Sequence, residues 1–269
     1  MKSFICATCG VQYPPSESVP EHCPICEDER QYLPVTGQRW LNYSEVSSTY
    51  ENLCLEEEPG LLLVASEPRV GIGQCARIIH TPHGNVMWEC TPVLTSETRR
   101  RITALGGIQA FALSHPHFQS TIVEWSMAFD NAPIFIHEAD RQWIQRDMAN
   151  MRYWHGEQHV LCDGMTLINC GGHFDGSTVL HWRDGAAGAG ALFTGDTITV
   201  VQDHRWVSFM RSYPNLIPLS ARKIRKIVSR VHGLQFDRLY SSWIGEIVTN
   251  DAHAAVIRSA DRYIQAITD

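Results

Sequence analysis

The sequence predicts an α/β fold preceded by a small four-cysteine module, and three observations support this prediction. From about residue 36 onward, short apolar runs that end at glycine, proline or histidine are interleaved with helical patterns. Three of these runs are followed within three residues by histidine or aspartate. The first 35 residues are rich in proline and cysteine and too short to form a hydrophobic core, so they need a bound metal to stabilise their fold. We therefore expect a four-cysteine metal knuckle at residues 1–35 and a main domain at residues 36–269.

The knuckle contains two Cys-x-x-Cys pairs, Cys6/Cys9 and Cys23/Cys26, separated by thirteen residues. Two turns of this kind can close a tetrahedral thiolate shell around zinc or iron. Four unrelated or disulfide-paired cysteines are the alternative, which the total of nine cysteines disfavours because it is odd. The metal is zinc in a structural ribbon or iron in an electron-transfer centre, and the spacing leaves both open.

The elements of the main domain follow from its apolar patterns. Six runs predict strands, at residues 61–66, 108–113, 133–138, 166–170, 178–182 and 191–195. A first helix is expected from a Ser96 cap to Gly106, a second over residues 220–233 and a third from Asn250 to about Ile267. The second helix places Ile224, Ile227, Val228 and Val231 on one face. The stretch GAAGAGA at 185–191 lacks the Lys-Ser/Thr of a phosphate loop, so we expect a hairpin turn there.

Charge and hydropathy limit the function classes. The formal net charge is -7 and the basic residues are scattered, which disfavours nucleic acid and anionic membranes as partners. The cluster Arg99–Arg101 is read as a solvated helix face. Neither a signal-peptide pattern nor an apolar run of about 20 residues occurs. We therefore expect a cytoplasmic protein.

Histidine and aspartate residues follow three of the predicted strands. His115 and His117 come after the run IQAFAL, His173 follows Cys170-Gly-Gly, and Asp196 follows Thr194-Gly. Neutral imidazoles and a carboxylate are good ligands for zinc or iron, and loops at strand ends can aim them at one point. These residues predict a metal site, with remnants of an inactive site as the alternative.

In this order, and together with PIFIHEADR and TGDT, residues from about 60 to 245 resemble the metallo-β-lactamase superfamily. The resemblance implies an αββα sandwich with the metal at one edge between the two sheets. His115, His117 and His173 match the first metal site, and Asp196 matches the carboxylate that bridges to or joins the second. Residues 4–33, with Cys-x-x-Cys-Gly, an aromatic at Tyr13 and Cys-Pro-x-Cys, resemble the rubredoxin-like module of rubrerythrins, although Glu27 stands where rubredoxins usually have glycine.

The departures from the family pattern are informative. Gln119 and Ser120 stand where the family has aspartate and histidine, and near the expected final histidine the chain has only Tyr240-Ser-Ser-Trp243. None of these is a strong ligand for a divalent cation, so we expect a single ion. Gln119 cannot ionise, and it therefore cannot orient or deprotonate a water molecule as a carboxylate would.

Three functions remain open. A metal-dependent hydrolase of an unidentified small molecule is favoured, with His173 and Asp196 as its catalytic residues. An iron-dependent oxidoreductase or dioxygenase served by the knuckle, and a non-catalytic metal-stabilised binding protein, are the alternatives. We expect a substrate pocket lined by Gln119, Trp206, Arg211, Tyr213, Tyr240 and Trp243, although core packing would explain most of the aromatic residues equally well. The sequence leaves open a homo-oligomer and, if the knuckle holds iron, an electron-transfer partner.

Overall fold

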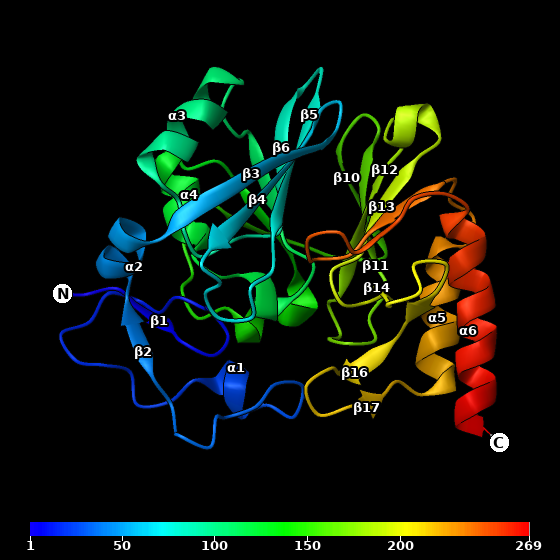
Figure 1. The fold of residues 1–269 in the computed structure, drawn as a ribbon, viewed down its shortest axis with the longest axis horizontal. Helices are drawn as coiled ribbons and strands as arrows, with labels where there is room; N and C mark the ends of the chain where they lie inside the picture. Colours follow the sequence, from blue (N-terminus) through cyan, green and yellow to red (C-terminus); the bar gives the residue numbers. More distant parts are fainter. Residues whose placement is uncertain (269) are drawn as a thin grey trace. The chain divides into compact units, whose positions relative to one another are not determined.

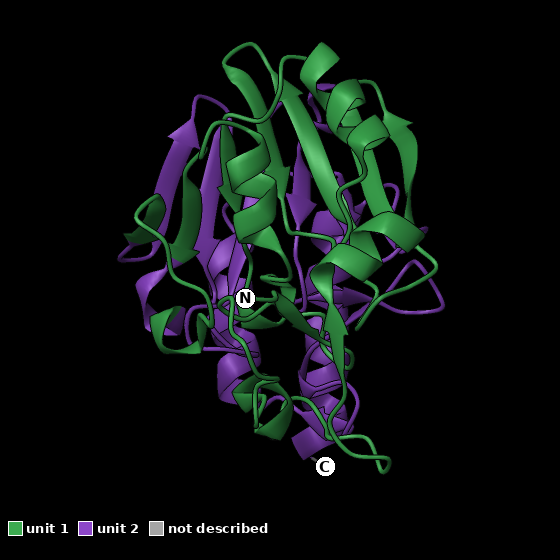
Figure 2. Cartoon of the chain, turned by 90° about the vertical axis from the view of Figure 1, so that its left-hand side faces the viewer, with its two compact units in different colours: residues 1–136, 141–153 green, residues 137–140, 154–269 purple. Residues whose placement is uncertain are grey.

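The structure is a computed structural model that describes residues 1–268, and the chain divides into two units (Figure 2). Unit 1 consists of Met1–Ile136 and Arg141–Tyr153, and unit 2 consists of His137–Asp140 and Trp154–Asp269. Each unit has its own sheet and its own hydrophobic core.

Unit 1 is built on a seven-stranded sheet in which the strands follow the chain order (Figure 1). Its strands are β3 (Glu51–Glu58), β4 (Leu61–Glu67), β5 (Ala76–Thr81), β6 (Gly84–Trp88), β7 (Ala110–Ala112), β8 (Ile134–His137) and β9 (Met151–Trp154). The first four are antiparallel, and β6, β7 and β8 are parallel. Because β7 enters the sheet as a parallel strand, its carboxyl end delivers the chain to the edge where loop residues can act.

Two helices cover one face of this sheet, α3 (Ser96–Ala104) and α4 (Ile122–Ala128) (Figure 1). Ile102 of α3 and Trp125 of α4 are fully buried in the core beside Phe111 of β7. The cap of α3 is Thr95, whose side chain accepts a hydrogen bond from the Thr98 amide. The prediction of Ser96 as the cap was therefore wrong by one residue.

The amino-terminal segment also belongs to unit 1. Its strand β1 (Phe4–Cys6) pairs antiparallel with β2 (Trp40–Asn42), and the short helices α1 (Pro24–Glu27) and α2 (Tyr43–Thr49) flank the pair. The four knuckle cysteines form a small buried cluster with Val11 and Ile25. Trp40, Ile72 and Trp143 pack against this cluster, so the knuckle is fastened to the rest of unit 1.

Unit 2 is built on a six-stranded sheet, in the order β10 (Gln158–Cys162), β11 (Met165–Asn169), β12 (Thr178–Trp182), β13 (Ala191–Phe193), β18 (Arg238–Tyr240) and β19 (Ile247–Val248). Neighbouring strands are antiparallel except for β13 and β18. Two small hairpins lie outside the sheet, β14 (Thr199–Val200) with β15 (Val207–Ser208) and β16 (Met210–Ser212) with β17 (Ile217–Pro218).

Helices α5 (Ala221–Val231) and α6 (Ala252–Thr268) pack on the unit 2 sheet (Figure 1). Ile224, Ile227 and Val231 of α5 are fully buried, and Val228 packs against the same core, which confirms the predicted apolar face. The glycine-rich stretch joins β12 to the antiparallel β13, as the predicted hairpin turn requires. Through Thr268, no helix has both the length and the apolar character that a membrane crossing needs.

Candidate metal centres

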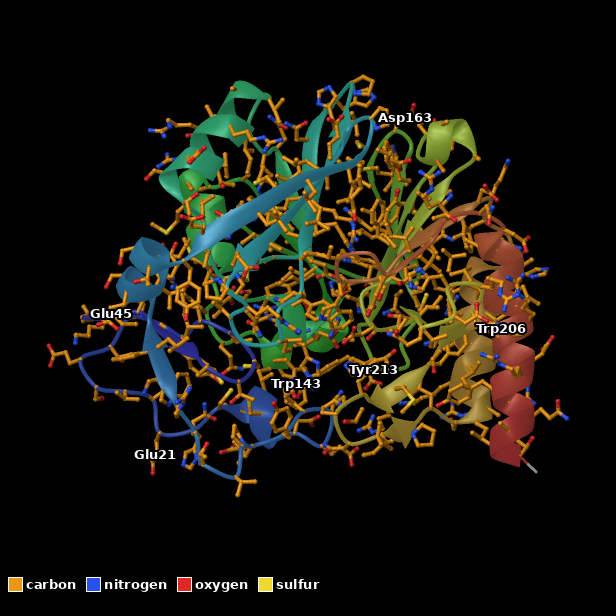
Figure 3. The ribbon with its side chains drawn as sticks, viewed as in Figure 1. Glu21, Glu45, Trp143, Asp163, Trp206 and Tyr213 are labelled. Carbon is orange, nitrogen blue, oxygen red and sulfur yellow. The ribbon has the colours of Figure 1, made fainter. Side chains whose placement is uncertain are left out.

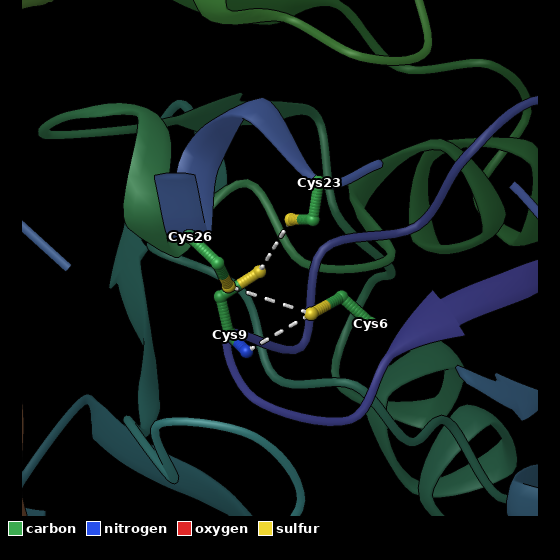
Figure 4. Close-up of side chains that lie close together, drawn as sticks. All are labelled: Cys6, Cys9, Cys23 and Cys26. Carbon is green, nitrogen blue, oxygen red and sulfur yellow. Dashed lines mark hydrogen bonds between the residues drawn. The ribbon is translucent and has the colours of Figure 1, made fainter. Parts of the chain in front are cut away.

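The two Cys-x-x-Cys turns bring four thiol groups together in unit 1 (Figure 4). Their sulfur atoms all lie within 4.8 Å of one another, with 3.6 Å between Cys6 and Cys26 and 3.7 Å between Cys9 and Cys23. These distances exclude disulfides, whose sulfur atoms are about 2.05 Å apart. Four sulfurs at about 2.3 Å from a central ion would be about 3.8 Å apart in a regular tetrahedron. The cluster thus fits a tetrathiolate zinc or iron site.

Hydrogen bonds around the cluster favour thiolate at Cys6. The pKa of the Cys6 thiol is lowered because the thiols of Cys23 and Cys26 share hydrogen bonds with it. The Cys9 amide and the Gln38 side-chain amide also donate to the Cys6 sulfur, at 3.5 Å and 3.1 Å. Such donors stabilise a metal-bound thiolate and hold it in place. The Gln38 contact lies beyond residue 35 and was not predicted.

His115 and His117 form a buried pair at the carboxyl end of β7. Backbone at His115 is extended, and a short 3-10 turn, Pro116–Phe118, then brings His117 beside it. The ring centroids are 5.1 Å apart with an interplanar angle of 72°. Each side chain is only 2% exposed. The His-x-His spacing therefore places two imidazoles close together, as the strand-end argument predicted.

The surroundings of His115 keep its imidazole neutral. Burial, assisted by the positive charge of Arg30, lowers the pKa of His115 to about 3. The Ser114 hydroxyl lies 2.7 Å from Nδ1, and the Ser114 amide donates to Oε2 of the buried Glu89 at 3.3 Å. A neutral imidazole held at Nδ1 presents Nε2 as a ligand atom. Glu89 and Ser114 are supporting residues that the sequence motif did not reveal.

In unit 2, His173 lies in a tight loop after β11. The amides of Cys170 and Gly171 both donate to the Ser177 carbonyl, and the Phe174 amide donates to the Ser177 hydroxyl at 2.7 Å. Asp140 accepts a hydrogen bond from the Gly176 amide at 2.7 Å. A β-carbon added at position 176 would clash with the Asp140 carboxyl group. Glycine is therefore required there for Asp140 to hold the loop.

His173 and Asp196 form a second buried pair. The distance between His173 Nε2 and Asp196 Oδ2 is 4.0 Å, and the residues are 1% and 5% exposed. Nδ1 of His173 lies 3.3 Å from the Met210 carbonyl oxygen, so Nε2 is the nitrogen nearer Asp196. Two atoms 4.0 Å apart can both contact one ion at the usual distance of about 2.1 Å. The pair thus fits half of a metal shell.

Tyr213 supports the backbone at Asp196. Its hydroxyl donates to the Asp196 carbonyl oxygen at 3.0 Å and accepts from the Thr199 hydroxyl at 2.6 Å. The ring centroids of Tyr213 and His173 are 6.0 Å apart. Burial raises the pKa of Asp196 to about 6, and the neighbouring His173 opposes part of this shift. The carboxyl group therefore exchanges its proton close to neutral pH in the absence of metal.

Gln119 and Ser120, at the positions where the family has further ligands, make structural contacts within unit 1. The Gln119 amide donates to the carbonyls of Pro116 and Trp143, each at 3.0 Å, and its oxygen accepts from the Gln145 amide at 3.1 Å. Ser120 adopts a left-handed backbone, with φ of 43°, and its hydroxyl donates to the Gly10 carbonyl of the knuckle at 3.3 Å.

The other residues expected to line a pocket lie in different surroundings. Tyr240 is 1% exposed and stacks on Phe193, with ring centroids 4.9 Å apart. Trp206 lies beside α6, where the guanidinium carbon of Arg262 is 3.6 Å from its ring centroid (Figure 3). Arg211 and Trp243 are half-buried. Among the six residues, Tyr213 contacts His173 and the Asp196 backbone, and Gln119 donates to the Pro116 carbonyl between His115 and His117.

Comparison with known proteins gives one relative in sequence and a common fold in structure. No family model matches the chain. The chain is 46% identical over 269 residues to the uncharacterized protein YmaE of Bacillus subtilis strain 168, a match that covers 99% of this chain and 97% of YmaE.

Solved structures with the same fold are metallo-β-lactamases and similar proteins. DIM-1 metallo-β-lactamase exposed to ceftazidime has a TM-score of 0.59 and 15% identity, over 80% of this chain and 98% of its own. A Cronobacter sakazakii metallo-β-lactamase with an HARLDQ motif has a TM-score of 0.52 and 17% identity, over 84% and 95%. The di-iron-bound form of TTHA1623 has a TM-score of 0.51 and 17% identity, over 78% and 98%. The predicted metallo-β-lactamase fold is therefore confirmed.

Proposed function

The chain belongs to the same protein family as YmaE of Bacillus subtilis and has the metallo-β-lactamase fold, and from this premise we propose that it is a metal-dependent hydrolase of a small molecule. We propose further that a single ion is held by the candidate ligand set His115, His117, His173 and Asp196. We assign residues 1–35 to the knuckle and residues 36–269 to the hydrolase domain. The observation that carries the proposal is the burial of two ligand pairs at strand ends, each supported by its own hydrogen bonds.

The donor set suits one divalent ion. Three imidazoles and one carboxylate are typical ligands of zinc, and two imidazoles with a carboxylate are typical of non-haem iron. A bound ion of this kind supplies Lewis acidity toward a water molecule and toward a carbonyl or ester. Gln119 does not add a carboxylate, because its amide is engaged with Pro116, Trp143 and Gln145. This engagement supports a mononuclear rather than a two-metal site.

The residues of the chain have distinct parts in the proposed reaction. His115 is held neutral by burial, so it offers a lone pair without first losing a proton. Asp196 would supply a carboxylate oxygen to the ion or anchor the water molecule that the ion activates. Tyr213 fixes the Asp196 backbone and presents its ring beside His173. We propose that Tyr213 and Gln119 line the substrate pocket.

Metal analysis of a His173→Ala variant tests the proposal. We expect purified protein to contain one ion in the knuckle and one at the histidines, and the variant to lose one ion per chain and to lose hydrolysis of model esters and lactones. A Cys23→Ser variant should instead lose the knuckle ion. An unchanged metal content in His173→Ala would refute the proposed ligand set.

An iron-dependent oxidoreductase is a second candidate, and the contact between the knuckle and the histidine loop favours it. The Gly10 carbonyl, next to Cys9, accepts a hydrogen bond from Ser120, three residues after His117. An electron-transfer centre would be well placed beside a mononuclear iron in this arrangement. Iron-replete protein should then show the visible absorption of a ferric tetrathiolate and consume dioxygen. Colourless protein that retains full activity with zinc would exclude this candidate.

A further inference from the structure

We propose that the four-cysteine knuckle positions the His115–His117 loop, so that metal in the knuckle strengthens metal binding at the histidines. This inference rests on the proposed function, because it assumes that the histidines bind an ion. Ser120 is then a positioning residue. The knuckle influences metal binding at the histidines, although none of its residues is among the ligands proposed there. Three groups of contacts within unit 1 carry it.

The first contact joins Ser120 to Gly10, which follows Cys9, and to Gln12, which forms an isolated β-bridge with Ile5. The Ser120 hydroxyl donates to the Gly10 carbonyl at 3.3 Å, and the Ser120 carbonyl accepts from the Gln12 amide at 3.1 Å. Ser120 is 3% exposed and lies three residues after His117. A residue at the position of a family metal ligand is thus used here to fasten the knuckle to the histidine loop.

The second contact fastens α4, which follows the histidine loop directly. The side chain of Gln12, 2% exposed, donates to Glu124 at 3.1 Å and accepts from Arg146 at 2.5 Å. Arg146 also pairs with Glu124 at 2.6 Å. Buried polar groups that satisfy one another hold their elements in one arrangement, and losing one partner leaves the others unpaired. Gln12 therefore connects the knuckle to α4, through Glu124, and to the segment that carries Arg146.

The third contact runs through Arg30 and Trp143. The Arg30 guanidinium carbon lies 4.9 Å from the Trp143 ring centroid, and Asp28 orients the same side chain through a bidentate ion pair. The Trp143 carbonyl accepts from the Gln119 amide at 3.0 Å. A shift of the knuckle would therefore move Trp143, and with it a support of the Gln119 side chain.

The knuckle can exert this effect because its loop depends on the cysteines. Two backbone hydrogen bonds close the turn itself, from the Gly10 amide to the Cys6 carbonyl at 2.8 Å and from the Cys6 amide to the Val11 carbonyl at 2.9 Å. Metal binding to such a module supplies much of its folding free energy. Without metal the loop samples other conformations, and Gly10 and Gln12 no longer hold Ser120. Coupling between sites is reciprocal, so occupancy of either site should favour the other.

The test measures the dissociation constant of Co²⁺ at the histidine site in the full chain, with zinc in the knuckle of the wild type. We expect Cys26→Ser, which lacks the knuckle ion, to bind Co²⁺ about 5- to 150-fold more weakly, the range usual for coupled sites. Ser120→Ala, which keeps the knuckle ion, should show a smaller loss in the same direction. Zinc content of each variant is measured alongside.

Ser126→Ala is the matched control. Ser126 is also a buried serine of unit 1, and its hydroxyl donates to the Ala132 carbonyl at 2.8 Å, away from the knuckle. It should lose thermal stability comparably to Ser120→Ala but bind Co²⁺ as the wild type does. If Cys26→Ser does not fold, Ser120→Ala decides the question alone.

The outcomes separate the two proposals. Equal Co²⁺ affinity in the wild type, Ser120→Ala and Ser126→Ala overturns the coupling and leaves the hydrolase proposal standing. Equal weakening in Ser120→Ala and Ser126→Ala also overturns it, because the effect would then follow from general destabilisation. A wild type that binds no ion beyond the one in its knuckle overturns the proposed function, and the coupling with it.

Discussion

The close approach of two glycines in unit 1 leads to a sharp prediction about Gly71→Ala. Gly71 has φ of +61°, and a β-carbon added there would lie 2.5 Å from the Gly10 nitrogen and 2.6 Å from the Gly10 α-carbon. Both atoms are backbone, so no side chain can rotate away. Alanine at position 71 must therefore displace the knuckle turn or its own segment.

The magnitude follows from a comparison with Gly37, which has φ of +84° and nothing within 4 Å of an added β-carbon. Alanine in a left-handed conformation costs about 1–2 kcal/mol, so Gly37→Ala should lose about that much free energy of unfolding. Gly71→Ala should lose this and about 1–3 kcal/mol more, the usual cost of overpacking. Urea unfolding of both variants, with excess zinc in each sample, measures the difference.

Equal losses of unfolding free energy in Gly71→Ala and Gly37→Ala would refute the reasoning, because the conformational penalty would then account for both. A larger loss in Gly71→Ala together with weaker zinc retention by the knuckle would locate the strain at the Gly10 turn.

Three further predictions follow from buried polar groups. Glu57→Gln should cost about 3–5 kcal/mol, because it leaves Arg77 buried beside a neutral partner. Tyr213→Phe should cost about 1–3 kcal/mol, because the Thr199 hydroxyl and the Asp196 carbonyl lose their shared partner. In metal-free protein, burial raises the pKa of Asp196 from 3.8 to about 6, so protonated Asp196 contributes about 3 kcal/mol to the free energy of unfolding. This contribution is full below about pH 4 and is lost as the pH rises through about 6.

Each of these has its own measurement. Chemical unfolding of Glu57→Gln should contrast with that of Arg183→Ala, whose ion pairs are exposed and contribute little; similar losses would contradict the prediction. Tyr213→Phe should also lower Co²⁺ affinity, and unchanged stability would show that water replaces the hydroxyl. Asp196→Asn should remove the pH dependence between about 4 and 6, so parallel stability curves for the variant and the wild type would contradict the raised pKa.

The parts of the fold that depend on local pattern were predictable. The run Thr178–Trp182 was predicted as a strand with the bounds that β12 has, and α5 has the predicted buried face. Strand β3, Glu51–Glu58, was missed because half of its eight residues are glutamates that read as a solvated segment. It lies at the edge of the sheet, where charged side chains are favoured because they prevent pairing with another chain.

The candidate site likewise combines residues that the sequence revealed with contacts that it did not. His115 and His117 were found because they lie just past the end of an apolar run, which is a local signal. The bond from Gly176 to Asp140 spans 36 residues and that from Ser120 to Gly10 spans 110, and no periodicity in the sequence records such pairings. The sequence showed that position 120 carries serine in place of the family's histidine. The hydrogen bond by which Ser120 holds the knuckle could be seen only in the structure.

The position of the knuckle in the chain has a consequence for biosynthesis. Its four thiols and the pairing of Phe4 with Asn42 lie within the first 42 residues. Chains are synthesised from the amino terminus and fold in that order. The metal-loaded knuckle can therefore form while His115 is still unsynthesised. We therefore expect the yield of folded protein to fall when zinc and iron are withheld during synthesis.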